Sequence, residues 1–293
     1  MSWLEALRTV QPRVTHLSPE GARLALDAAL EGLVGYQAHL DRPAPPHTVF
    51  VAARTVFTAP LEWIAVLTGR GGRVTVKSPD ALVPWFEQLA GLVDGLAVTT
   101  DRDVVDDADR VVAMGSDATI AALQARVGEK LLGFGARTSF AWWTDPERAH
   151  ELAQDLILHD GRGCMSPTAI FSPIPNAARL LHQALADSPV PRGALAPIEA
   201  ARIRERTALA RVLGQAYEGD DHTVLSLPRS HAASVGFPRL AVVHPCADEH
   251  ELWSSLPTDR VSVIGTDAPL HTSFRTAPLG SMQRPPLDRL HDG

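Results

Sequence analysis

The sequence predicts an α/β protein with two lobes, each built around a mostly parallel, doubly wound sheet. Short apolar runs alternate with stretches of helical periodicity along most of the chain, which is the pattern of strands joined by helical crossovers. The chain has 293 residues, and single cores stop growing at roughly 250–300 residues, which favours two lobes over one.

Composition limits the class of protein further. Hydrophobic residues make up 45% of the chain and charged residues 21%, as in an ordinary folded domain. The formal net charge is −7 and no basic stripe is present, so we do not expect nucleic-acid binding. No apolar run approaches the ~20 residues of a membrane span, and the N-terminal residues lack a signal-peptide core. We therefore expect a cytoplasmic protein that acts on a small molecule.

The first lobe is predicted over residues 1–145. A helix begins at Pro19 with Ser18 as its N-cap and runs to about Leu40, where the proline-rich linker 41–47 follows. Strands are then predicted at 48–52, 72–77, 95–100, 110–115 and 130–135, with helices at 60–69, 79–93 and 117–127. This order is the outline of a nucleotide-binding sheet, whose ligands lie at the carboxyl ends of the strands.

The second lobe is predicted over residues 146–267, with an extended C-terminal segment over 268–293. Its strands are expected at 168–172, 222–227, 239–244 and 260–265, and its helices at 146–158, 177–185, 194–217 and 249–255. A polar, glycine-rich turn over 159–167 precedes the first of these strands.

Cys164 lies in this turn, between two glycines and a Ser-Pro pair. Structural cysteines usually lie in apolar runs, whereas flanking glycines let the backbone approach a ligand closely. Arg162 would favour the thiolate, which is the form that attacks a carbonyl carbon. The local sequence leaves two alternatives open, a nucleophile and an inert loop cysteine.

The other cysteine, Cys246, ends a predicted strand, where a small hydrophobic residue is the ordinary explanation. His244 and His250 lie near it, but their spacing is not that of a known zinc site. We therefore assign Cys246 no function and expect no metal.

Two further segments end predicted strands. Lys77 closes one strand, and Asp80 opens the helix that follows, so both face the carboxyl edge of the sheet, where a dinucleotide ribose would fit. Gly115 and Ser116 end another strand where a helix begins, which is a place suited to a phosphate. The structural alternatives are a solvated Lys77, Asp80 as a first-turn acid, and Ser116 as an ordinary N-cap.

The order of these segments resembles the aldehyde dehydrogenase superfamily, and most closely the fatty acyl-CoA reductases of bacterial bioluminescence operons. The resemblance runs from about Val49 to the C-terminus. It rests on VTVKSPD at 74–80, VVAMGSDATI at 111–120, LLGFGARTSF at 131–140, GRGCMSPTAIF at 161–171 and PLGSMQRPPLDRLHDG at 278–293.

The resemblance implies an aldehyde-dehydrogenase-like fold and a reaction. Cys164 would be the nucleophile that takes the acyl group from an acyl-CoA or acyl-protein thioester, and a nicotinamide cofactor would reduce the acyl-enzyme to an aldehyde. The cofactor, NADPH or NADH, would be bound by Lys77, Ser78, Asp80, Gly115, Ser116, Gly133 and Gly135.

Direction and cofactor choice follow from particular positions. Relatives that oxidise aldehydes need a carboxylate near the glycine turn to activate water, and residues 131–135 carry none, which favours reduction. Asp80 would pair with a free ribose hydroxyl and favour NADH, whereas the subgroup resemblance favours NADPH.

Two departures from the family pattern motivate an alternative. Thr58 stands where the family usually has an asparagine that donates to the oxyanion, and the chain is shorter than typical members. The alternative is a catalytically degenerate relative that serves as an interaction subunit of an acyl-transfer complex. A third hypothesis is a reductase of acyl phosphates. By analogy we expect a homo-oligomer or a partner protein that transfers the acyl group.

Overall fold

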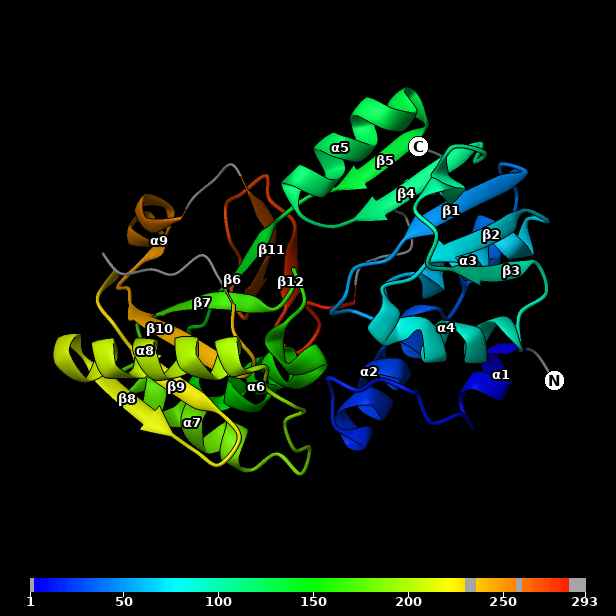
Figure 1. Ribbon diagram of the computed structural model, residues 1–293. Coiled ribbons are helices and arrows are strands. Elements are labelled where there is room, and N and C mark those ends of the chain that lie inside the picture. Colours follow the sequence, from blue (N-terminus) through cyan, green and yellow to red (C-terminus); the bar gives the residue numbers. More distant parts are fainter. Residues whose placement is uncertain (1–2, 230–235, 257–259, 285–293) are drawn as a thin grey trace. The chain divides into compact units, whose positions relative to one another are not determined.

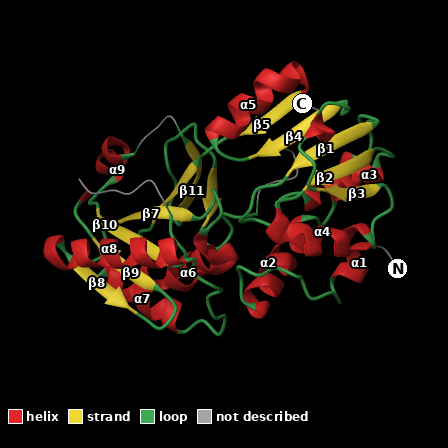
Figure 2. Ribbon diagram, viewed as in Figure 1, coloured by secondary structure: helices red, strands yellow, loops and turns green. Residues whose placement is uncertain are grey.

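The computed structural model describes residues 3–229, 236–256 and 260–284 (Figures 1 and 2). The chain forms two compact units, each with its own sheet. Unit 1 comprises Met1–Thr15, Ala22–Ala136 and Arg284–Gly293, and unit 2 comprises His16–Gly21 and Arg137–Gln283. Most strand pairs in both sheets are parallel, which confirms the predicted α/β class. The end of the motif at 278–293, from residue 285 on, lies outside the described residues.

Unit 1 contains a five-stranded sheet in which every pair of neighbours is parallel, in the order β3-β2-β1-β4-β5. Its strands are β1 (His47–Val51), β2 (Arg73–Lys77), β3 (Leu96–Thr99), β4 (Arg110–Met114) and β5 (Leu131–Phe134). The order reverses between β1 and β4. In sheets of this type ligands bind outside the carboxyl ends of the strands, at such a reversal.

The helices of unit 1 cover both faces of this sheet. They are α1 (Trp3–Leu7), α2 (Pro19–Gly32), α3 (Leu61–Gly69), α4 (Val83–Ala90) and α5 (Asp117–Val127). Phe50 of β1 packs against Trp63 of α3 on one face of the sheet. On the other face, Val49 of β1 packs with Val111 of β4 and Leu123 of α5.

The helix predicted to reach Leu40 ends earlier, at Gly32. Gly35 follows in the left-handed region at φ 84°, a conformation that a continuing α-helix cannot contain. The start of the helix agrees with the prediction, because the backbone nitrogen of Gly21 donates to the Ser18 hydroxyl over 3.0 Å.

Unit 2 contains a seven-stranded sheet in the order β12-β11-β6-β7-β10-β9-β8, in which only β8 runs antiparallel to its neighbour among the pairs of named strands. The strands are β6 (Thr138–Trp142), β7 (Pro167–Ser172), β8 (Gln215–Glu218), β9 (Thr223–Ser226), β10 (Leu240–Pro245), β11 (Val261–Thr266) and β12 (Thr276–Pro278).

The helices of unit 2 also lie on both faces of their sheet. They are α6 (Ala149–Ile157), α7 (Ala177–Ala186), α8 (Pro197–Leu213) and α9 (Glu249–Ser255). Ile203 and Ala210 of α8 pack on Leu225 and Val242 of one face. Side chains alternate along a strand, so Val243 points to the opposite face, where α7 contacts β10 and packs beside α6.

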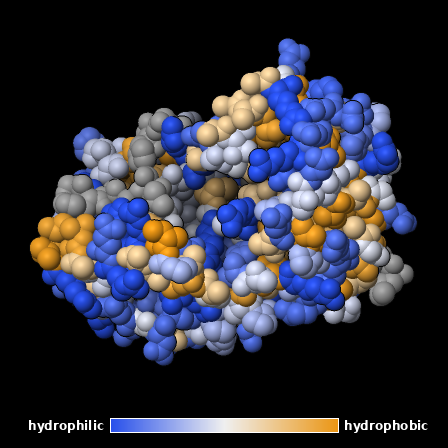
Figure 3. Space-filling model, in the orientation of Figure 1, coloured by the Kyte–Doolittle hydropathy of each residue, from blue (hydrophilic) through white to orange (hydrophobic). Residues whose placement is uncertain are grey.

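Helix α8 also exposes apolar side chains to solvent. Val212 is 82% exposed, and Leu209 and Leu213 lie beside it on the outer surface. Figure 3 shows an apolar patch over the C-terminal end of α8. The apolar residues of α8 therefore form two stripes, of which one is buried against the sheet.

Three strands differ from or add to the predicted elements. The helix predicted to reach residue 217 ends at Leu213, and Gln215–Glu218 form β8 instead. Gly214 explains the change: a Cβ there would lie 2.0 Å from the Ser226 carbonyl oxygen, so only glycine lets the chain approach β9. Strand β6 had not been predicted, and part of the tail predicted as extended pairs with β11 as β12.

Candidate active site

Cys164 lies in the turn that leads into β7, and its side chain is exposed. The turn precedes Pro167, the first residue of the strand, so the thiol lies at the amino end of the sheet of unit 2. The hydroxyl of Ser139 in β6 donates a hydrogen bond of 2.7 Å to the backbone carbonyl of Cys164. The backbone of the candidate nucleophile is therefore fixed to the neighbouring strand while its thiol remains accessible.

The backbone before Cys164 has an uncommon conformation. His159, Asp160 and Gly161 all lie in the left-handed region, at φ 53°, 54° and 70°. Two of them are not glycine, so hydrogen bonds must hold this turn against its steric cost. The Asp160 carboxylate supplies them: it accepts from Arg239 Nε over 2.8 Å and from the Gly193 backbone nitrogen over 2.9 Å.

Arg162, which the sequence suggested would favour the thiolate, bonds to carboxylates and carbonyls around the turn. Its guanidinium donates two hydrogen bonds to Glu199, of 3.2 and 3.0 Å, and one of 3.2 Å to Asp160. It also donates to the carbonyls of His16 and Ala194, and only 7% of its side chain is exposed. Its charge is thus balanced by two carboxylates, and its hydrogen bonds help to hold the turn.

Cys246 is structural, as predicted. It is 3% exposed, and burial raises the pKa of its thiol to about 11. The thiol donates to the Asp248 carbonyl over 3.4 Å. The nearby His244 is buried, with Nδ1 2.9 Å from the Leu227 carbonyl oxygen. Within residues 3–229, 236–256 and 260–284, no group of His, Cys, Asp and Glu side chains is arranged to hold a metal.

The residues proposed to bind the cofactor all lie in unit 1. Lys77 is the last residue of β2 and pairs in register with Val51 of β1, at the carboxyl edge of the sheet. Gly115 and Ser116 follow β4 at the same edge. Ser116 is exposed and caps α5, since its hydroxyl accepts from the Thr119 backbone nitrogen over 3.2 Å. The topology therefore gathers these residues where the strand order reverses.

Ser78 and Asp80 lie just beyond β2. Ser78 is fully buried, and its hydroxyl donates 2.8 Å to the Pro79 carbonyl, so this hydroxyl is used within its own turn. Asp80 is exposed and begins a short 3₁₀ turn before α4. Of the two side chains, that of Asp80 faces solvent at this edge.

Gly133 and Gly135 lie on and just after β5, where they pack against α5. A Cβ at Gly133 would lie 2.6 Å from Ile120, and one at Gly135 would lie 2.5 Å from the Asp117 carboxylate. Asp117 also accepts from the backbone nitrogen of Ala136 over 2.8 Å. A carboxylate is thus present beside the glycine turn, although residues 131–135 contain none; it comes from α5.

Thr58 also belongs to unit 1. It is 8% exposed, and its backbone carbonyl accepts from the nitrogen of Leu61 over 3.0 Å at the start of α3. The proposed cofactor residues and Thr58 are thus in one unit, and Cys164 is in the other.

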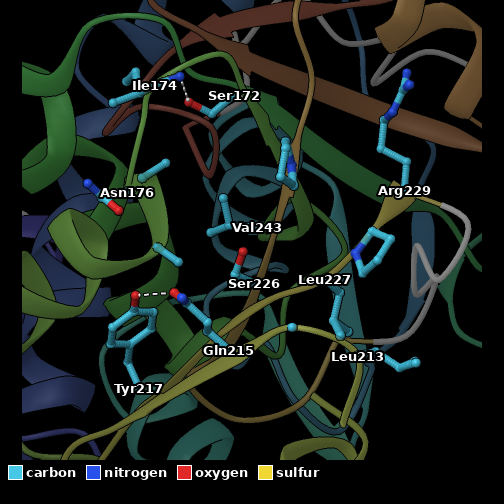
Figure 4. Close-up of a pocket in the computed structure, with 15 residues that line it drawn as sticks. Ser172, Ile174, Asn176, Leu213, Gln215, Tyr217, Ser226, Leu227, Arg229 and Val243 are labelled. Carbon is cyan, nitrogen blue, oxygen red and sulfur yellow. Dashed lines mark hydrogen bonds between the residues drawn. The ribbon is translucent and has the colours of Figure 1, made fainter. Parts of the chain in front are cut away.

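A cavity of about 680 Å³ in unit 2 had not been predicted (Figure 4). Ser172, Ser226 and Pro245, the last residues of β7, β9 and β10, line it together with Asn176 and Tyr217. It therefore opens at the carboxyl edge of the sheet, whereas Cys164 lies beyond the amino end of β7. The strand ends in the sequence could have indicated it, because ligands bind at this edge in such sheets.

Among the described residues, no helix is long and apolar enough to cross a membrane.

Solved structures with the same fold include several dehydrogenases. Aldehyde dehydrogenase 21 from Physcomitrella patens is 12% identical, with a TM-score of 0.71 over 94% of this chain and 73% of that one. An oxidoreductase from Marinobacter aquaeolei is 12% identical, with a TM-score of 0.68 over 90% and 68% of the two chains. Methylmalonate-semialdehyde dehydrogenase from Oceanimonas doudoroffii is 13% identical, with a TM-score of 0.65 over 91% and 69%. These likenesses confirm the aldehyde-dehydrogenase-like fold.

Sequence comparison identifies the family. No curated protein sequence matches the chain. The model of the acyl-CoA reductase (LuxC) family matches residues 92–256, which is more than half of the chain and includes both the Gly-Ser turn after β4 and the turn that carries Cys164. The chain therefore belongs to the acyl-CoA reductase (LuxC) family, in the aldehyde-dehydrogenase-like group of oxidoreductases that act on aldehydes.

Proposed function

We propose that this protein reduces an acyl-CoA or acyl-protein thioester to an aldehyde, with NADPH or NADH as reductant and Cys164 as nucleophile. The observation that carries the proposal is the exposed thiol of Cys164, presented from a fixed turn inside the segment that matches the family model. The other cysteine is buried, and its raised pKa keeps it protonated.

The cysteine chemistry has two stages. In the first, the thiolate of Cys164 attacks the thioester carbonyl, the carbon–sulfur bond to CoA breaks, and CoA leaves as a thiolate that takes up a proton. In the second, the acyl-enzyme carbonyl is reduced to a thiohemiacetal, which loses its hydroxyl proton as the carbon–sulfur bond to Cys164 breaks. Aldehyde leaves, and the thiolate is regenerated.

The residues at the carboxyl edge of unit 1 fit a nicotinamide dinucleotide. When bound, the reduced nicotinamide supplies the hydride. Lys77 ends β2 at the carboxyl edge of the sheet, where its ammonium would reach a ribose or phosphate. Gly115 and Ser116 would hold the phosphates at the exposed N-terminus of α5, because its backbone amides favour an anion.

Asp80 bears on the choice between NADH and NADPH. Its exposed carboxylate near Lys77 would accept from a free ribose hydroxyl and would repel a 2′-phosphate. Family membership favours NADPH. Measuring both cofactors with the wild-type protein and with Asp80→Asn decides between them, since removing the charge should favour NADPH.

The glycine turn bears on the direction of the reaction. Reduction is favoured because residues 131–135 supply no carboxylate that could activate water against the acyl-enzyme. Asp117 lies beside the turn, and its Oδ1 already accepts from the backbone nitrogen of Ala136.

The test is the consumption of reduced nicotinamide with a panel of acyl-CoAs. Cys164→Ala should abolish it, and the matched variant Cys246→Ala should retain it. Acyl phosphates in the same assay test the third substrate class. If Cys164→Ala consumes reduced nicotinamide as the wild type does, Cys164 is not the nucleophile.

A second candidate function is an interaction subunit without catalytic activity. Thr58 favours it, because a hydroxyl in place of an amide is a weaker oxyanion donor, and losing such a donor can cost about 10²–10³ in rate. Folded wild-type protein that consumes neither cofactor with any acyl donor would support this candidate. In either case we expect a cytoplasmic protein that acts as a homo-oligomer or with a partner that transfers the acyl group.

A further inference from the structure

Arg239 and Asp160 are joined by two hydrogen bonds, although they lie 79 residues apart in the sequence. The backbone nitrogen of Arg239 donates to the Asp160 carbonyl over 3.0 Å, and the side-chain Nε donates to Oδ1 over 2.8 Å. Both side chains are 1% exposed. This is a buried ion pair that also joins two backbone segments.

Both residues have left-handed backbones, with φ 48° for Arg239 and 54° for Asp160. A short acidic side chain can tolerate this region by local hydrogen bonding, but an arginine rarely adopts it. The paired conformations therefore depend on the bonds between the two residues, because neither is favoured on its own.

The rest of the network is anchored on backbone atoms of residues 190–193. Arg239 Nη1 donates to the Val190 carbonyl over 2.6 Å, and Nη2 donates to the Pro191 carbonyl over 3.2 Å. Asp160 Oδ2 accepts from the Gly193 nitrogen over 2.9 Å. Asp221 provides the second carboxylate for Arg239, at 3.0 Å. The guanidinium and the carboxylate thus have their polar atoms satisfied, and the turn before Cys164 has a fixed position.

A buried ion pair adds little net stability, because the desolvation of both charges offsets their attraction. What it can add is a unique conformation. Here the conformation it specifies is the left-handed turn four residues before Cys164, and Ser139 fixes the chain on the other side.

We propose that Asp160 and Arg239 are positioning residues for Cys164: their buried ion pair fixes the left-handed turn that presents the thiol. The proposal rests on the proposed function in taking Cys164 as the reacting residue. It predicts that weakening the pair displaces the thiol without altering cofactor binding, since the proposed cofactor residues lie in unit 1.

Two substitutions test it. Asp160→Asn keeps the shape of the side chain and its tolerance of a positive φ, and removes the charge. Arg239→Lys is milder, because it keeps the charge and loses the planar fork that reaches several acceptors. Leu181→Ala is the matched control: Leu181 is fully buried in α7, so truncating it destabilises unit 2 without removing any hydrogen bond of the network.

The first readout is amide hydrogen exchange in the peptide that contains residues 159–166, where the nitrogens of Arg162 and Ser166 donate to the carbonyls of His159 and Gly163. We expect exchange there at least tenfold faster in both network variants. The second is steady-state kinetics, where kcat should fall about 10- to 100-fold while KM for the reduced nicotinamide stays within twofold.

Leu181→Ala should show neither effect at a temperature where all the proteins are folded. If the network variants match Leu181→Ala in exchange and in kcat, the pair is only structural and the proposal is wrong. If the wild type reduces no acyl donor, the proposed function fails, and hydrogen exchange together with the rate of Cys164 alkylation by iodoacetamide still decides whether the pair positions the thiol.

Discussion

The hydroxyl of Ser139 donates a hydrogen bond of 2.7 Å to the backbone carbonyl of Cys164, from the strand next to the one that Cys164 precedes. Ser139 is fully buried, so its hydroxyl is shielded from solvent. The bond fixes the chain at the carbonyl of Cys164, whereas the Asp160 turn fixes the residues that precede Cys164. The exposed thiol is therefore carried on a backbone that is held in place at both ends.

Ser139→Ala should lower both stability and reactivity. Removing the hydroxyl leaves the Cys164 carbonyl without this donor, at a cost of about 1 kcal/mol in the free energy of unfolding. We expect kcat to fall at least fivefold. The matched control is Thr168→Val, which removes the hydroxyl that donates 3.2 Å to the Ser139 carbonyl and does not involve the carbonyl of Cys164. Urea unfolding and steady-state kinetics measure the two effects, and equal losses of kcat in the two variants would contradict the assignment.

The two cysteines should differ strongly in alkylation. Burial raises the pKa of Cys246 to about 11, so roughly a thousandth of it is ionised at pH 8, and only the thiolate reacts. Cys164 is exposed and should react first with iodoacetamide. Peptide mass spectrometry after a short exposure should find the label on Cys164. Comparable labelling of Cys246 in folded protein would contradict the finding that its thiol is buried.

Ser116 permits a test that separates capping from cofactor binding. Ser116→Ala removes the N-cap of α5 and should cost about 1 kcal/mol of stability. Ser116→Asp keeps a good cap and adds a negative charge where the phosphates are proposed to bind. We expect near wild-type thermal stability for Ser116→Asp, with NAD(P)H affinity at least tenfold weaker by fluorescence titration.

The charge control for this experiment is Ala125→Asp, at an exposed position near the other end of α5. It makes the same change in net charge and should bind the cofactor as the wild type does. If both aspartate variants bind equally well, the phosphates do not lie at the N-terminus of α5.

Residues 131–135 contain no carboxylate, which predicts how much CoA the protein releases from acyl-CoA when no reductant is present. Wild-type protein mixed with acyl-CoA alone should release CoA in an amount equal to the protein and then stop, because water is not activated against the acyl-enzyme. Acid quenching and chromatography measure the CoA. Continued release that Asp117→Asn abolishes would identify Asp117 as a base and overturn the argument for reduction.

Local features of the fold could be predicted from the sequence. Helices α5 and α9 have the predicted bounds because Ser116 and Asp248 cap them with side-chain hydrogen bonds, which are properties of adjacent residues. Strand β6 was missed because all five of its residues are buried, so the strand lacks the alternation that reveals a half-buried strand. Strand β8 was assigned to a helix because its apolar residues continue the helical spacing, and the close approach of Gly214 to β9 is a tertiary contact.

In the candidate site too, features set by adjacent residues could be predicted and those set by tertiary contacts could not. The glycines correctly indicated a turn at Cys164, and the structure adds that its side chain is exposed. The partners of Arg162 could not be predicted, because nearness in sequence does not determine where a long side chain points, and Glu199 is 37 residues away. The ion pair of Asp160 with Arg239 spans 79 residues, and no spacing rule connects such positions.

His159 gives a final prediction, on the pH dependence of stability. Burial lowers the pKa of this residue to about 3 from its usual 6.5, and the charge of His16 adds to the shift. The folded protein therefore keeps His159 neutral, while the unfolded chain binds a proton below pH 6.5. Stability from this residue is complete above pH 6.5 and is lost as the pH falls toward 3, by about 2 kcal/mol between pH 6.5 and 5.

His159→Asn, which tolerates the positive φ at this position, should flatten the dependence of the free energy of unfolding on pH, measured by urea unfolding. His150→Asn, at an exposed position, should not. Parallel slopes for the wild type and His159→Asn would mean that the pKa of His159 is the same in the folded and unfolded states, and the lowered pKa of the buried imidazole would have to be abandoned.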